Sequence, residues 1–359
     1  MRSGFTAWAR TVASAILGIL AAVAAVELGL RPFLTPQGPP TPRVAQDSVG
    51  GDTLVRRQLD EGVSIARFST GGARLTGNPF LPDAPVVVLL GDSYVVARAV
   101  ADDATMGSVL ERDARASGFQ LNVRQYGWSG ASPSRYLLVA DSVLRRWNPA
   151  TVVIALSDND LDENALHEAN PQLRVASPTD LRILPFAEPQ AIAAPRYSSL
   201  SVLLETRTWE LQWRRARAAE AAEAPSTQPT DDASTPSDAA LPDSVQLALL
   251  PRAVVHALAA KFKSRLAIVY LAEVRIAGDD TTSTIERSLL AACEIEHVRC
   301  RSTRRSMLAA RSRGVIARGF FNTTPGNGHL NAAGNALVGA DIWDLLSERR
   351  VGLISARGR

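Results

Sequence analysis

A serine ends a short turn that follows an apolar run near the first quarter of the chain. Residues 86–93 read Val-Val-Val-Leu-Leu-Gly-Asp-Ser, a pattern typical of a fully buried parallel strand that ends in a turn. Ser93 would then leave the carboxyl end of that strand, where open α/β sheets place their ligand sites. A serine hydroxyl held in such a turn is a candidate nucleophile if a base lies within reach. Gly-Asp-Ser is also common in ordinary turns and at helix N-caps. The interpretation of Ser93 as a nucleophile therefore depends on whether other parts of the chain supply a base and oxyanion donors.

Three other short segments carry groups that could serve as those partners. They are Gly127-Trp-Ser-Gly130 and Ser157-Asp-Asn-Asp160, each directly after a predicted strand, and Gly326-Asn-Gly-His329, ahead of the last predicted helix. Hydrolysis of an ester needs a nucleophile, a base, and donors aimed at the developing oxyanion. Ser93 and Gly130 offer backbone N–H groups, Asn159 a side-chain amide, and His329 a base. Taken alone, Asn159 would be read as an Asx-turn at the end of a strand.

Strands and helices alternate along most of the chain. Apolar runs at 85–90, 120–126, 151–156, 265–271 and, more weakly, 296–300 predict strands; helical periodicity covers 104–117, 134–146, 247–262, 281–293 and 332–348. This alternation predicts a parallel sheet with helices on both faces. Right-handed crossovers would place the carboxyl ends of all strands, and therefore the polar segments that follow them, at one edge.

Together the four segments resemble the blocks of the SGNH (GDSL) hydrolase superfamily, in the family's order. The resemblance spans residues 85–348 and implies a flavodoxin-like three-layer α/β/α sandwich. It also implies that Ser93 is the nucleophile, that Gly130 and Asn159 join Ser93 in the oxyanion hole, and that His329 is the base. It implies no cofactor and no metal.

The chain departs from the family at the acid that accompanies the histidine. The family usually carries an acid three residues before the histidine, and here that residue is Gly326; Asn327 follows where some relatives have Asp. In the serine-protease template, replacing the triad Asp by Asn costs about 10⁴ in kcat. Three interpretations follow: a Ser93–His329 dyad oriented by a backbone carbonyl, a more distant acid such as Asp160 or Asp158, or a weak or inactive relative. Asn327 remains a candidate orienter.

The N-terminus combines basic residues with a long apolar segment. Arg2 and Arg10 precede the uncharged residues 11–26, and apolar character continues to Leu30. This length favours an uncleaved membrane anchor over residues 1–31, with a cleaved signal peptide as the alternative. The positive flank places the N-terminus in the cytoplasm and the body of the protein outside. A Pro-rich spacer and lead-in is predicted for 32–80, followed by the hydrolase-like domain at 81–354.

The composition of the chain indicates one insertion and limits the kinds of partner and compartment that we expect. Residues 161–245 are predicted to be an insertion that includes a helical stretch, 198–217, and a disordered segment, 218–243. A net charge of +3 over 359 residues gives no reason to expect nucleic-acid binding. Cys293 and Cys300, the only cysteines, could form a local disulfide in an oxidising compartment or remain buried thiols.

The sequence therefore predicts an exported, membrane-anchored serine esterase. Location and family suggest O-acyl esters, for example acetyl esters, of a cell-envelope glycan or lipid as substrates. One alternative is an O-acyltransferase for envelope polysaccharide that uses the same serine and histidine. Another is a non-catalytic envelope binding or scaffold protein, which the missing acid favours. The 161–245 insertion could dock a partner in the envelope.

Overall fold

The computed structural model describes residues 2–30, 54–58, 61, 64–69, 71–168, 171–184, 241–274, 276, 281–320, 323 and 325–348. Among these residues, helix α1 (Arg2–Leu30) belongs to one compact unit, while residues 61–184 and 241–348 belong to a second unit that holds the α/β body. Within α1, Thr11–Leu30 has a mean hydropathy of 2.2, so this helix is long and apolar enough to cross a membrane.

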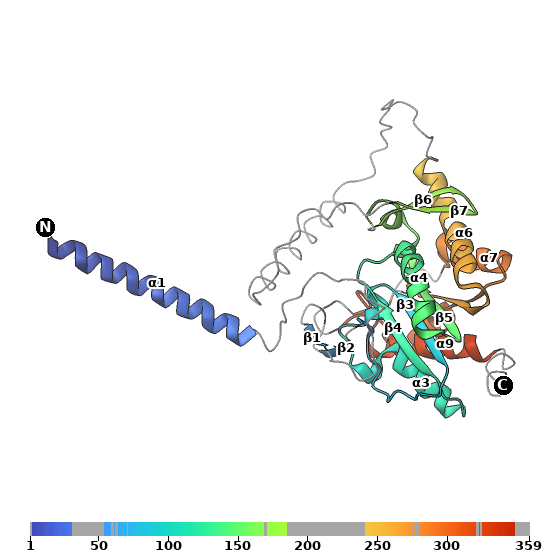
Figure 1. Ribbon diagram of the computed structural model, residues 1–359, viewed down its shortest axis with the longest axis horizontal. Helices are drawn as coiled ribbons and strands as arrows, with labels where there is room; N and C mark the ends of the chain where they lie inside the picture. Colours follow the sequence, from blue (N-terminus) through green and yellow to red (C-terminus); the bar gives the residue numbers. More distant parts are fainter. Residues whose placement is uncertain are drawn as a thin grey trace. The chain divides into compact units, whose positions relative to one another are not determined.

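The α/β body is built on a five-stranded sheet (Figure 1). Its strands are β3 (Val86–Gly91), β4 (Asn122–Gly127), β5 (Thr151–Leu156), β8 (Leu266–Tyr270) and β9 (Arg299–Ser302). All neighbours are parallel, and the spatial order is β4-β3-β5-β8-β9. Counting the strands along the chain, this is the flavodoxin-like order 2-1-3-4-5, whose switch point lies between β3 and β5. The predicted fold class is confirmed.

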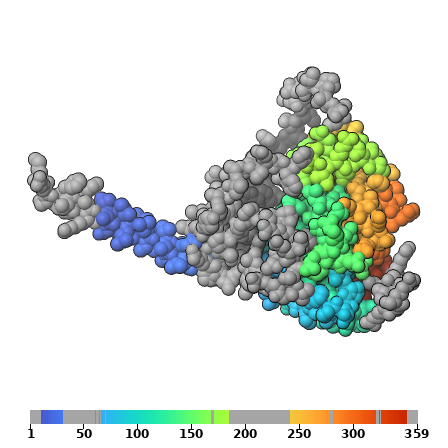
Figure 2. Space-filling model, in the orientation of Figure 1, coloured from blue at the N-terminus to red at the C-terminus, as the bar shows by residue number. Residues whose placement is uncertain are grey.

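Two helical layers cover the sheet because successive strand residues point to opposite faces. Val88 and Leu90 pack in one core with α4 (Pro133–Trp147), α6 (Asp243–Phe262) and α7 (Thr284–Ile295). Val87 and Leu89 pack in a second core with α3 (Met106–Ala116), α8 (Arg304–Ser312) and α9 (Ala332–Ser347). The first layer, green for α4 and orange for α6, forms part of the surface in Figure 2. Although α6 has the composition of a membrane span, it is a helix of this core.

Several short elements complete the described chain. They are strands β1 (Leu54–Gln58) and β2 (Ser64–Phe68), helix α2 (Ser93–Val96), a π-helical turn at Asn164–Glu168, and 3₁₀ turns at Asp102–Ala104, Asp158–Asp160 and Lys263–Arg265. The start of the predicted insertion forms an antiparallel pair, β6 (Leu173–Ser177) and β7 (Asp180–Ile183). The predicted helix at 198–217 lies outside the described residues. So does most of the predicted disordered segment, although its last residue, Asp243, already begins α6.

A disulfide joins Cys293 in α7 to Cys300 in β9, with 6.1 Å between the Cα atoms. It therefore ties the last turn of a helix to the strand that follows it, at the edge of the sheet.

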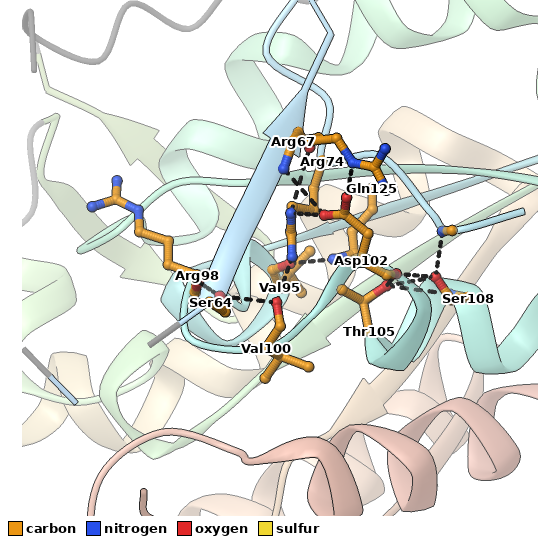
Figure 3. Close-up of polar contacts among 11 residues, drawn as sticks. Ser64, Arg67, Arg74, Val95, Arg98, Val100, Asp102, Thr105, Ser108 and Gln125 are labelled. Atoms are coloured by element: carbon orange, nitrogen blue, oxygen red, sulfur yellow. Dashed lines mark hydrogen bonds and ion pairs between the residues drawn. The ribbon is translucent and has the colours of Figure 1, made fainter. Parts of the chain in front are cut away.

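In the described part of the lead-in to the first sheet strand, a buried ion pair attaches β2 to the α/β body (Figure 3). The Pro-rich residues 32–50 lie outside the described residues. The Asp102 carboxylate, 5% exposed, accepts hydrogen bonds from the side chains of Arg67 and Arg74 and from the Arg67 backbone N–H at 3.1 Å. Arg74 is 2% exposed and also donates to the Val100 carbonyl at 2.6 Å. The Ser64 hydroxyl donates to the Arg98 carbonyl at 2.6 Å. These contacts fix β2 to the segment that follows α2.

We expect Asp102→Asn to destabilise the protein strongly, because the Arg74 guanidinium would stay buried without its counter-charge. Breaking one partner of a buried pair typically costs about 3–5 kcal/mol in the free energy of unfolding. Urea unfolding of the two proteins measures the difference. The neighbouring Asp103→Asn is the control, since Asp103 is exposed. Equal losses in the two variants would contradict a role for the buried pair.

Candidate active site

Ser93 lies at the carboxyl end of β3, as the first residue of α2. The Asp92 side chain caps this helix by accepting the Tyr94 N–H at 2.9 Å, which fixes the turn around the serine. Gly91 makes the turn sterically feasible, because a Cβ there would lie 2.3 Å from Cγ2 of Val95. The strand, the glycine and the capping aspartate thus hold the serine hydroxyl at the edge of the sheet.

His329 joins that hydroxyl to a carboxylate. Its Nε2 lies 2.7 Å from the Ser93 Oγ, and its Nδ1 lies 2.7 Å from Oε2 of Glu61. The other Glu61 oxygen accepts the His329 backbone N–H at 3.2 Å. With Glu61 ionised, Nδ1 carries the proton and Nε2 accepts from the serine, which is the tautomer that a general base needs. Ser93, His329 and Glu61 therefore form a continuous hydrogen-bonded chain.

Glu61 corrects the sequence-based search for the acid. Asn327 is exposed, and the Asp160 carboxylate accepts from Ser157 and from the Tyr136 hydroxyl instead. Asp158 likewise accepts from the hydroxyls of Tyr270 and Ser283. The acid comes from the lead-in, between β1 and β2, and not from the segment around the histidine. No local motif marks it, since 268 residues separate it from His329.

The histidine is itself held by the loop around it. Arg318 and Leu330 form an isolated antiparallel bridge, and the Gly319 N–H donates to the His329 carbonyl at 2.9 Å. Asn331 caps α9 by accepting the Gly334 N–H at 3.1 Å. The Tyr94 ring lies 5.2 Å from the imidazole, centroid to centroid. The backbone contacts of the loop and the Tyr94 ring therefore restrict the position of the imidazole.

The two predicted oxyanion donors end strands on either side of β3. Asn159 follows β5 and donates from Nδ2 to the Asp92 carboxylate at 3.3 Å, while its Oδ1 accepts from the Ser157 hydroxyl. Since an amide nitrogen carries two hydrogens, one remains for a ligand. Gly130 follows β4 and has φ +69°, with open space where a Cβ would stand. The left-handed backbone conformation is the reason for a glycine there.

Two carboxyl groups are buried beneath these donors. Burial raises the pKa of Asp160 well above its ordinary value, and the neighbouring Asp92 raises it further. Burial also raises the pKa of Asp92. Asp160 accepts the Ser157 N–H at 2.9 Å and the Tyr136 hydroxyl at 3.0 Å, so it holds the turn that carries Asn159. Its role is to support that turn and not to contact the histidine.

Comparison of this chain with known proteins finds a likeness in structure but none in sequence. The chain matches no protein-family model and no curated protein sequence. Solved structures that it resembles include the acetyl xylan esterase AlAXEase (13% identity, TM-score 0.41, covering 72% of this chain and 98% of that one). A second is a lipase/acylhydrolase from Enterococcus faecalis (12% identity, TM-score 0.41, covering 74% of this chain and 96% of that one). A third is a member of the lipolytic G-D-S-L family from Veillonella parvula (13% identity, TM-score 0.37, covering 74% of this chain and 99% of that one). At such identities and TM-scores, any assignment of chemistry depends on the atoms of the site.

We expect Glu61→Gln to lower kcat for an ester by about 10³–10⁴, because an amide cannot offset imidazolium charge and can favour the wrong tautomer. Hydrolysis of 4-nitrophenyl acetate measures the loss. Asn327→Ala is the matched control and should change the rate little. A loss in Asn327→Ala together with full activity in Glu61→Gln would contradict the geometry.

The raised pKa of Asp160 also predicts how stability depends on pH. The folded protein holds this proton more tightly than the unfolded chain, whose carboxyl titrates near about 4. The resulting stabilisation is complete below the unfolded pKa and is lost as pH rises through the folded pKa. The Tm of the natural protein should therefore fall, relative to that of Asp160→Asn, as pH rises from about 4. The exposed Asp141→Asn is the control, and a constant Tm difference for Asp160→Asn would overturn the prediction.

Proposed function

We propose that this protein is a serine-dependent ester hydrolase of the SGNH type. The observation that carries the proposal is the hydrogen-bonded chain from Ser93 through His329 to Glu61, with 2.7 Å at each ring nitrogen. A serine, a base and an orienting acid in this order are what acyl transfer through a covalent intermediate requires. Their position at the carboxyl edge of the sheet, beside the switch point, agrees with the placement of ligand sites in open α/β sheets.

In the proposed reaction, His329 takes the Ser93 proton as the hydroxyl oxygen attacks the acyl carbonyl. Glu61 stabilises the imidazolium that forms. The backbone N–H groups of Ser93 and Gly130 and the Asn159 amide receive the oxyanion, each such donor being worth about 3–4 kcal/mol in measured systems. His329 then gives its proton to the leaving alkoxide, and the acyl group stays on Ser93. Water, activated by His329, releases the acid and restores the serine.

The complete chain of hydrogen bonds argues against the non-catalytic alternative. That interpretation depended on the missing acid near His329, and Glu61 supplies one from another part of the sequence. The hydrophobic length of α1 supports a membrane-anchored protein whose catalytic domain is exported, with a cleaved signal peptide as the other form of export. In that location, O-acyl esters of an envelope glycan or lipid are the proposed substrates.

The experiment is labelling with a serine-directed fluorophosphonate, followed by turnover of 4-nitrophenyl acetate. We expect one equivalent of label on the natural protein, none on Ser93→Ala, and hydrolysis that is lost in Ser93→Ala. Circular dichroism of both proteins serves as the control for folding. An unlabelled protein with a native spectrum would overturn the enzyme proposal. Acyl transfer to an added glycan that outpaces hydrolysis would identify an O-acyltransferase instead.

A further inference from the structure

A cavity lies beside the candidate active site at the same edge of the sheet. Its volume is about 230 Å³, and it lies between the segment that follows β8 and the segment that follows α8. Apolar side chains dominate its walls, which are formed by Val274, Ile276, Met307, Arg311, Gly314, Val315, Ile316, Ala317, Arg318 and Gly326. None of the reaction steps given above uses this space.

The cavity coincides with a concentration of exposed apolar side chains. Ile276, Val315 and Ile316 are 49%, 38% and 42% exposed. Outside α1, the described part of the chain exposes only three other large apolar side chains to this degree, namely Leu138, Val245 and Ile295. Scattered exposed apolar residues need no explanation, but a group of them around a hollow indicates a binding surface. The ligand that fits such a surface is itself apolar.

Arg318 connects this cavity to the catalytic side chains. It is 7% exposed, lines the cavity, and donates hydrogen bonds to the Tyr94 hydroxyl and, at 3.4 Å, to the Ala272 carbonyl. Its guanidinium also lies 4.8 Å from the centroid of the Tyr94 ring. Tyr94 in turn follows Ser93 and contacts the His329 imidazole. One residue, Tyr94, thus separates the wall of the cavity from the reacting groups.

We propose that this cavity binds the acyl chain of the ester substrate, and that the chain is an apolar one of medium length. The proposal depends on the esterase function proposed above and names its acyl group. A cavity of about 150 Å³ holds benzene, whereas drug-sized ligands occupy about 300–1,000 Å³. A volume between these values suits a chain of roughly six to eight carbons. An acetyl group bound at Ser93 would leave the cavity unused.

Binding of octanoate to the Ser93→Ala protein tests the cavity independently of catalysis. We expect saturable binding by calorimetry, with acetate binding at least about tenfold more weakly, as expected when several methylene groups lose an apolar pocket. Ile316→Asp, in the Ser93→Ala background, should weaken octanoate binding about tenfold or more. Leu138→Asp in the same background is the matched control, because Leu138 is an exposed apolar residue on α4 and should leave binding unchanged.

The same substitution should change substrate selectivity in the active protein. Ile316→Asp should lower kcat/KM for 4-nitrophenyl octanoate about tenfold relative to that for the acetate ester. Absence of octanoate binding, or equal binding by the Ile316→Asp and Leu138→Asp proteins, would overturn the proposed pocket. Octanoate binding that Ile316→Asp abolishes, in a protein that hydrolyses neither ester, would support the pocket and overturn the esterase function.

Discussion

The position of one imidazole ring governs the proposed chemistry. His329 contacts Ser93 through one ring nitrogen and Glu61 through the other, at 2.7 Å in both cases. These three residues come from the loop before α9, the turn after β3 and the lead-in before β2. Each segment must be placed to within a fraction of an ångström for both hydrogen bonds to form at once. The structure therefore has to fix three separate parts of the chain relative to one ring.

The parallel arrangement of the strands brings several of the segments at the site together. β3, β4 and β5 lie side by side, so the segments that follow them reach one edge of the sheet together. The Asn159–Asp92 hydrogen bond then links the turn after β5 to the turn that carries Ser93. Beneath the edge, Asp160 holds the first of these turns through Ser157 and Tyr136. The polarity of the sheet thus brings the groups near, and buried hydrogen bonds set their orientation.

The features that could be predicted from the sequence are the local ones. Buried strands such as β3 and β5 are visible as apolar runs, and Ser93, Asn159 and His329 each lie in a short motif. Glu61 could not be found in this way, because its only signature is a contact across 268 residues, made by a lone acid in a segment interpreted as spacer and lead-in. The attachment of β2 was missed for the same reason, since it depends on buried charges at Arg74 and Asp102 that a charge pattern would place at the surface.

Because Glu61 comes from the lead-in, its position depends on a part of the structure other than the loop that holds His329. In a chain with the acid beside the histidine, one loop would position both groups. Here Glu61 precedes β2, and β2 is attached through Arg67, Ser64 and the buried Asp102 rather than through the loop that holds His329. Because segments of a protein open with different free energies, opening of β2 alone would remove the carboxylate and leave Ser93 and His329 in contact. The Arg74–Asp102 pair therefore stabilises the fold and also helps to keep Glu61 within hydrogen-bond distance of His329.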